Sequence, residues 1–256
     1  MCDINEKYRN KLKRVKECYE EIITEMKKED VNNFVVKDWI DEKEIMHKSI
    51  VFIFACPGRE EFIGNKPCCG QTGKNLDKFI NHLEGYLSVK SEEFKEEFNQ
   101  AEQKNEDYKQ SGDKLKPRYK FAILNSSDKV HFAALDNGSL PSDEEIASKV
   151  NNDLKVNKKI EILKKAKLIF CFGDEAKVYY DKTKKKLEII KPIECCHLGN
   201  QAINTKYPNK TLSAKKPEDR RHERIQKLFN DKKPVIEAIL KGASEDFNPS
   251  SQEQKN

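Results

Sequence analysis

The fold class follows from the stretch SIVFIFACPG at residues 49–58. Its first seven residues form an apolar run rich in β-branched and aromatic side chains, and Pro57 and Gly58 end the run. A strand without a polar face is typical of a sheet that is buried on both sides. Such sheets occur almost only in α/β proteins, whose helices cover both faces. We therefore expect a buried central strand over residues 49–55.

Three further apolar runs follow along the chain and alternate with segments of helical spacing. The expected strands are KFAILN (120–125), KLIFCF (167–172) and LEIIKPIECC (187–196). The expected helices cover residues 8–26, 76–87, 142–163, a short segment capped by Asp174, and 220–240 with an interruption before Pro234. Ser142 and Glu145 form a capping box at the start of the third helix. This order predicts a three-layer α/β/α sandwich with a central, mainly parallel four-stranded sheet.

The chain divides into three parts by composition. Residues 1–44 hold an amphipathic helix that we expect to pack on the core, and residues 45–242 form the α/β domain. Within that domain, residues 88–117 are strongly polar and predict a surface excursion, part helix and part loop. The tail at residues 243–256 has the composition of a disordered segment.

Composition excludes several classes of protein. Charged residues make up 36% of the chain, and 49 basic against 44 acidic residues leave a net charge of +5, which is a weak hint of a polyanionic partner. The apolar run at 50–56 is too short to span a bilayer, and the N-terminus has no apolar signal-peptide core. We expect a cytoplasmic protein whose eight cysteines are reduced thiols. Since no CxxC occurs, we expect neither a metal nor a cofactor.

The loop after the first strand carries the clearest chemical signal. It reads CPGREEFIGNKPCCGQTGKNL over residues 56–76. Glycines in a turn between a strand and a helix let the backbone approach a ligand closely and present N–H groups to an anion. The loop is neither a Walker A motif nor a dinucleotide fingerprint, so the residues alone indicate a phosphate- or base-binding loop.

This loop resembles the first motif of the uracil-DNA glycosylase superfamily, most closely the bacterial and thermophile class. The positions in register are Pro57, Gly58, Glu61, Pro67, Gly70, Gly73 and Leu76, with Gly64 displaced by one. Residues 121–125 resemble the family strand that ends in a base-reading asparagine, and residues 168–176 resemble its strand-Gly-x-x-Ala element. His197 resembles the histidine of the final motif. The resemblance covers residues 49–240 and implies a glycosylase-like fold.

The sequence departs from the family pattern at four places. Ala55 and Cys56 occupy the pair where the family carries an acid, and Cys68 occupies the position of the phenylalanine that stacks on uracil. Leu198 and Gly199 follow the histidine in place of Pro-Ser. The family's cluster cysteines are not matched, which argues against an iron–sulfur cluster.

The resemblance assigns roles to particular residues. His197 would donate a hydrogen bond to the departing base, Asn125 would read the pyrimidine edge, and Glu61 or Glu60 would orient the attacking water. The base pocket would also include Cys56, Pro57, Gly58 and Cys68. Each residue has a structural alternative: a lone histidine after a strand is usually a structural or surface residue, an asparagine at a strand end is often a turn residue, and Glu61 could form a salt bridge that holds the loop.

A second group of residues would contact DNA. Its members are Gly70, Thr72, Gly73, Lys74, Lys129 and the segment 198–210, which begins with Leu198, Gly199 and Asn200, with Arg220, Arg221 and Arg224 as further phosphate contacts. Leu198 would act as the apolar wedge that pushes the nucleotide out of the duplex. Asp128 and His131 follow Asn125 closely and are further candidates for the pocket lining. The alternative is a solvated loop with scattered lysines.

These assignments predict a monomeric DNA glycosylase that flips a nucleotide and leaves an abasic site. Because Cys68 is smaller than phenylalanine, we expect a modified or bulky pyrimidine, such as the modified cytosines of phage DNA, with uracil as the second choice. The role would be genome defence or repair. Two alternatives stay open: a catalytically silent glycosylase-like module that binds DNA or a protein partner, and a hydrolase of free nucleosides.

Overall fold

A computed structural model describes residues 4–14, 19–40, 47–110, 116–135 and 140–242. Its centre is a sheet of four parallel strands in the order β2-β1-β3-β4. The strands are β1 (His47–Phe54), β2 (Phe121–Asn125), β3 (Leu168–Phe172) and β4 (Ile193–Cys195). β4 is shorter than the expected strand at 187–196 because Pro192 precedes it and offers no N–H to a neighbouring strand.

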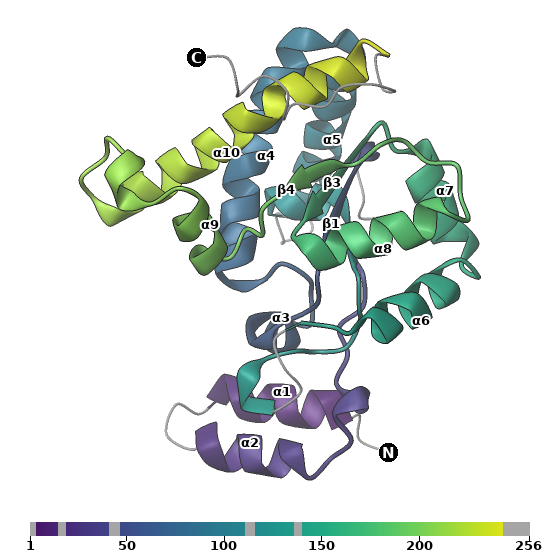
Figure 1. Cartoon of the computed structure of the whole chain (residues 1–256), viewed down its shortest axis with the longest axis vertical. Helices are drawn as coiled ribbons and strands as arrows, with labels where there is room; N and C mark the ends of the chain where they lie inside the picture. The colour runs from purple at the N-terminus through teal and green to yellow at the C-terminus, as the bar shows by residue number, and fades with distance from the viewer. Residues whose placement is uncertain (1–3, 15–18, 41–46, 111–115, 136–139, 243–256) are drawn as a thin grey trace.

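Helices cover both faces of the sheet (Figure 1). On one face lie α4 (Gly70–Lys90), α5 (Glu92–Gln110) and α10 (Pro217–Leu240), and on the other lie α6 (Asp143–Asp153), α7 (Asn157–Lys165) and α8 (Asp174–Lys184). The fold is therefore the expected three-layer α/β/α sandwich. Among the described residues, no helix is long and apolar enough to cross a membrane.

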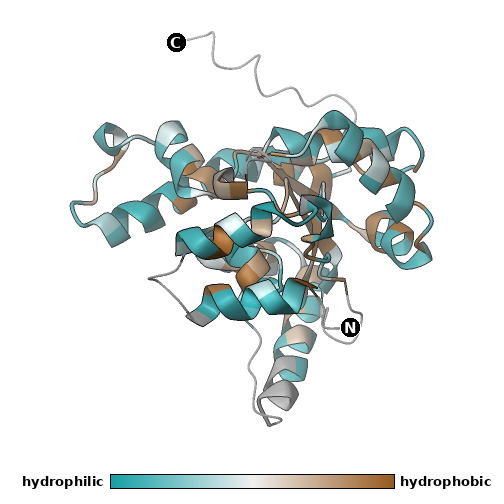
Figure 2. Ribbon diagram, turned by 90° about the horizontal axis from the view of Figure 1, so that it is seen from below, coloured by the Kyte–Doolittle hydropathy of each residue, from teal (hydrophilic) through white to brown (hydrophobic). Residues whose placement is uncertain are grey.

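The central strand supplies side chains to both layers. Ile50, Phe52 and Phe54 belong to the core under α4 and α10, whereas Val51 and Ile53 belong to the core under α6 and α8. Successive side chains of a strand point to opposite faces, so an unbroken apolar run fills two cores at once. Figure 2 shows the result: the apolar segments gather at the centre, and the helices turn hydrophilic residues outward.

The N-terminal segment forms two helices and not the single helix that its spacing predicts. α1 (Ile4–Arg14) and α2 (Tyr19–Lys27) lie side by side (Figure 1) and share a third apolar cluster with Phe62. In one straight helix, Tyr8 and Met26 would be about 27 Å apart at 1.5 Å per residue. Two helices let both side chains enter the same cluster, and the Tyr8 hydroxyl donates to Glu29 at 3.0 Å.

The polar segment at 88–117 contributes to the core through one helix. α5 packs along α4, and its Phe94, Phe98 and Ala101 side chains are buried. These three side chains therefore form a narrow buried stripe on α5, whereas Val89, near the end of α4, is exposed. The loop part of the prediction falls largely on residues 111–115, which lie outside the described residues.

The helices after β2 confirm one local prediction and correct two others. The capping box is confirmed: the Ser142 hydroxyl accepts the Glu145 N–H at 3.3 Å, and the Glu145 carboxylate accepts the Ser142 N–H at 3.0 Å. The helix expected over 142–163 is instead two, α6 and α7. Asp174 is the first residue of α8 and not its cap, which is Gly173.

The last helix is continuous where an interruption was expected. α10 runs from Pro217 to Leu240 and contains Pro234. The proline lies on the exposed side of the helix, so its ring does not displace a core residue. The tail at 243–256 lies outside the described residues.

Candidate functional site

A pocket of about 880 Å³ lies at the carboxyl ends of the strands. Residues at the end of each strand line its wall. They are Phe54 and the residues that follow it for β1, Asn125 for β2, Gly173, directly after β3, and Cys195 for β4. Parallel strands end at one edge of a sheet, and this edge is where α/β proteins usually bind ligands. The short helix α9 (Asn200–Lys206) closes one side of the pocket.

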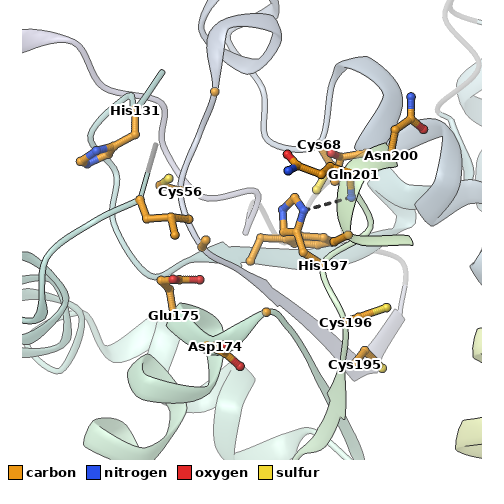
Figure 3. A pocket seen from close by; sticks show the side chains of 18 of the residues that line it. Cys56, Cys68, His131, Asp174, Glu175, Cys195, Cys196, His197, Asn200 and Gln201 are labelled. Atoms are coloured by element: carbon orange, nitrogen blue, oxygen red, sulfur yellow. Dashed lines mark hydrogen bonds between the residues drawn. The ribbon is translucent and has the colours of Figure 1, made fainter. Parts of the chain in front are cut away.

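His197 follows β4 and lines this pocket. Its Nδ1 accepts a hydrogen bond from the Gly199 N–H at 3.0 Å (Figure 3). A ring nitrogen that accepts carries no proton, so neutral His197 holds its hydrogen on Nε2. Burial lowers the pKa of His197 and favours this neutral form. His197 is thus a neutral hydrogen-bond donor at the pocket.

Gly199, which stands where the resembled motif has a serine, leaves room for the imidazole of His197. A Cβ at this position would lie 2.9 Å from His197 Nδ1, closer than real side chains approach. Any larger residue would push the imidazole away from the backbone N–H that fixes its tautomer. The glycine is therefore part of the arrangement that holds His197.

Asn125 ends β2 and is only 2% exposed. Its side chain lines the pocket, and its Nδ2 has no hydrogen-bond partner among the described residues. A buried amide without a partner costs about 1–3 kcal/mol, so native proteins keep few of them. This amide is a donor that a bound ligand would satisfy.

A cluster of buried charges holds the backbone of Asn125. The Asp38 carboxylate accepts the Asn125 N–H at 2.7 Å and also pairs with Lys149 at 2.7 Å and Lys159 at 2.6 Å. Burial alone would raise the pKa of Asp38, but the two lysines hold it below its usual value. Asp128 belongs to this cluster through Lys149 at 2.9 Å and does not line the pocket.

The first loop contains a short helix, α3 (Arg59–Gly64), that the sequence analysis did not expect. Glu61 in this helix lines the pocket, and its carboxylate accepts the Gly58 N–H at 3.2 Å. Burial raises the pKa of Glu61. Glu60 is exposed, pairs with Arg59 at 2.8 Å and does not reach the pocket.

Two of the four cysteine thiols at the pocket were expected there, those of Cys56 and Cys68. Burial, followed by the charges of Glu175 and Glu61, raises the pKa of Cys56 to about 12. Burial also raises the pKa of Cys68. Both side chains are therefore neutral and act as small apolar surfaces and not as nucleophiles. The described residues contain no group of histidine, cysteine and acidic side chains that could hold a metal ion.

No family model and no curated protein matches the chain. The ground for a function is therefore the geometry of the pocket, together with the motif resemblance.

The expected DNA contacts divide into residues at the pocket and residues away from it. Thr72, Gly199 and Asn200 line the pocket, as do Gly58 from the base-binding group and the further candidate His131. Pro57, Gly70, Gly73, Lys74 and Lys129 do not line the pocket. The Pro57 carbonyl accepts the His131 N–H at 2.9 Å, so it positions His131 from behind.

Two of these glycine and lysine positions have other structural roles. A Cβ on Gly73 would lie 1.7 Å from the Cys68 carbonyl oxygen, so this glycine permits close packing of the loop on α4. Lys129 pairs with Glu145 at 3.1 Å. Lys74 is exposed in the first turns of α4.

Leu198 does not occupy the position of a wedge. Its side chain is fully buried in the core under α4 and α10, and its carbonyl accepts the Asn75 amide at 2.7 Å. Arg224 is also buried, and its guanidinium binds the Tyr207 carbonyl at 2.9 Å, where no phosphate reaches it. Arg220 and Arg221 are partly exposed.

Several residues that line the pocket were not predicted from the sequence. They are Phe54, Leu140, Gly173, Asp174, Glu175, Cys195 and Cys196, whereas Gln201, Ala202, Thr205 and Lys206 belong to the segment 198–210 that was expected to contact DNA. In the sequence, Glu175 occupies one of the two unspecified positions of the Gly-x-x-Ala element, between Gly173 and Ala176. The rule that ligands bind at strand ends would have directed attention to the residues after β3.

Proposed function

We propose that the protein is a DNA glycosylase that takes a flipped pyrimidine nucleotide into this pocket and hydrolyses its N-glycosidic bond. One observation carries the proposal: the neutral donor His197 and the unpartnered amide of buried Asn125 line the same pocket at the carboxyl edge of the sheet. The order of the motifs along the chain supports it.

The two side chains match what base release requires. As the bond to the sugar breaks, negative charge develops on the base, and a fixed donor lowers the barrier most where that charge appears. His197 Nε2–H supplies such a donor without carrying a charge of its own. The Asn125 amide offers a donor and an acceptor, which is the pattern needed to read a pyrimidine edge.

The pocket favours a base larger than uracil. Its volume of about 880 Å³ lies in the upper part of the range of roughly 300–1,000 Å³ for small-molecule sites. Cys68, where the resemblance expects a stacking phenylalanine, leaves this space open. We propose a modified pyrimidine as substrate, in the context of genome defence, with uracil and repair as the second choice.

A panel of DNA duplexes tests this function. Each carries one uracil, 5-hydroxymethylcytosine or glucosylated 5-hydroxymethylcytosine, and abasic sites are detected by strand cleavage in alkali. We expect abasic sites in at least one duplex and a rate at least about 100-fold lower for His197→Ala. Lys165→Ala, on the exposed side of α7, is the control and keeps the parent rate. No abasic site in any duplex would contradict the proposal.

A silent binding module is the second candidate, because Ala55 and Cys56 supply no acid in the first motif. Its signature is tight binding to the same duplexes without cleavage. In that case His197→Ala and Asn125→Ala would change affinity alone, as fluorescence anisotropy would show.

A further inference from the structure

Glu175 brings a second carboxylate to the pocket beside His197. Gly173 has a φ of +100°, and a Cβ built on it would lie 3.6 Å from Glu175 Oε2 and 3.8 Å from His197 Cδ2. The missing side chain leaves a notch that the carboxylate and the imidazole both border. Cδ2 is bonded to Nε2, the nitrogen that carries the hydrogen.

Glu175 also lies near the position where the resemblance expects an acid. Among the charges that act on the Cys56 thiol, that of Glu175 is the strongest, ahead of Glu61. Figure 3 shows Glu175 and Cys56 on one side of the opening and His197 on the other. A carboxylate that comes from α8 therefore reaches the region that lacks one in the first motif.

The sugar of a flipped nucleotide would occupy this same region. Negative charge on a departing pyrimidine resides on the glycosidic nitrogen and on the carbonyl oxygen next to it. This oxygen is two bonds away from the nitrogen attached to the sugar carbon C1′, so a donor that binds it lies close to the sugar. Since His197 is that donor in the proposed function, the sugar would lie close to the imidazole, as the notch at Gly173 does.

We propose that Glu175 is a catalytic carboxylate that faces C1′, stabilises the positive sugar and activates the attacking water. The proposal rests on the proposed function. The C1′–N bond breaks, and its electron pair leaves with the base, which His197 stabilises as an anion. A bond forms between the water oxygen and C1′, and a water proton passes to Glu175 and from there to solvent. The base anion is protonated by solvent.

Glu61 is less suited to this step. Its carboxylate is engaged by the Gly58 N–H at 3.2 Å and so holds the turn that begins α3. Burial raises its pKa, which disfavours the charged form that stabilises a cation or accepts a proton. Glu61 therefore serves the shape of the first loop, and its removal should act on stability and binding.

A charged sugar analogue tests the role of Glu175 without knowledge of the base. The probes are two duplexes that carry, at one position, either a pyrrolidine ring, which is cationic, or a neutral tetrahydrofuran ring. The affinity of the parent protein for each is compared with that of Glu175→Gln and Glu61→Gln by fluorescence anisotropy. Asp181→Asn, an exposed position on α8, is the matched control.

We expect the parent and Asp181→Asn to bind the pyrrolidine duplex at least about 10-fold more tightly than the neutral one, and Glu175→Gln to lose this preference. On the duplex that the parent cleaves, Glu175→Gln should react at least about 100-fold more slowly. A pyrrolidine preference that survives Glu175→Gln, or that only Glu61→Gln abolishes, would overturn the inference, as would a parent protein without any preference. A parent that has the preference but cleaves no duplex would overturn the proposed function and the water-activating step, and would leave only the interaction of Glu175 with a positive sugar.

Discussion

The carboxylate of Asp38 accepts the backbone N–H of Asn125 at 2.7 Å, so a residue that precedes the sheet by sequence fixes the end of β2. Asp38 lies on a segment that pairs antiparallel with β2 through Trp39 and Ile123. The same carboxylate pairs with two buried lysines, both of which also pair with Asp153. The position of the candidate base-reading residue thus depends on an ion cluster behind it.

Asp38→Asn should therefore destabilise the protein strongly. Loss of one partner from a buried ion cluster leaves charge uncompensated and costs about 3–5 kcal/mol. We expect that decrease in the free energy of unfolding, measured by urea denaturation at pH 7.5. Glu161→Gln, which breaks an exposed pair with Lys165, is the control and should change it by less than about 0.5 kcal/mol. Equal effects of the two changes would show that the cluster adds no net stability.

Gly173→Ala should lower stability through the backbone. Its φ of +100° lies in a region that costs other residues about 1–3 kcal/mol. Gly85→Ala is the matched control, since a Cβ there meets nothing within 4 Å inside α4, and alanine should raise stability by about 0.5–1 kcal/mol. Thermal unfolding of both variants should therefore shift in opposite directions. A shift in the same direction would contradict the assigned backbone strain.

Leu198→Ala separates a core residue from a wedge. The side chain is fully buried, so its truncation should cost about 2–5 kcal/mol of folding free energy. Leu140→Ala removes a leucine that is 52% exposed at the pocket and should leave stability within about 0.5 kcal/mol. If Leu198→Ala is as stable as the parent in urea but no longer binds the duplex, the wedge interpretation returns.

His47 should make stability depend on pH. Burial, with the charges of Lys120 and Lys104, lowers its pKa to about 3, from an ordinary value near 6.5. The unfolded chain takes up a proton below pH 6.5 that the folded chain refuses, so stability is lost as the pH falls from 6.5 towards 3. The slope contributed is at most about 1.4 kcal/mol per pH unit.

His47→Phe should remove that part of the pH dependence. The ring stacks on Phe121, and neither of its nitrogens has a hydrogen-bond partner among the described residues. Between pH 7.5 and pH 5, the variant should lose about 2 kcal/mol less stability than the parent in urea titrations. His47→Gln provides a second neutral side chain at this site. Parallel curves for all three proteins would rule out His47 as the source.

The fold could be predicted from the sequence because its strands carry apolar side chains on both faces. The run at 49–55 and the runs ending at Asn125 and Phe172 are short and rich in β-branched and aromatic residues, which is typical of buried strands. Their alternation with helices predicts the parallel sheet. The division between α1 and α2 could not be predicted, because in the sequence the helical spacing of apolar residues continues across residues 15–18 as it would in one helix.

The site could be predicted from the sequence only where a residue ends a strand or lies in the loop after one. Asn125, His197 and Glu61 reach the pocket because strand ends converge there. Leu198 shows the limit of such predictions. A leucine after a strand is equally suited to a core and to a DNA wedge, and only the structure shows that this one is buried. Glu175 was missed because its approach to His197 depends on the empty position at Gly173, which is a property of the folded backbone.

The helical hairpin of α1 and α2 packs against the loops of the pocket from outside. Arg9 donates to the Phe62 carbonyl in α3 and to the Val35 carbonyl, both at 2.9 Å, and Val130 joins the same apolar cluster. These contacts tie together the loop that carries Glu61 and the loop that follows Asn125. A molecule that drew the hairpin away would loosen both loops at once. The hairpin thus supports two walls of the pocket although none of its own described residues lines it.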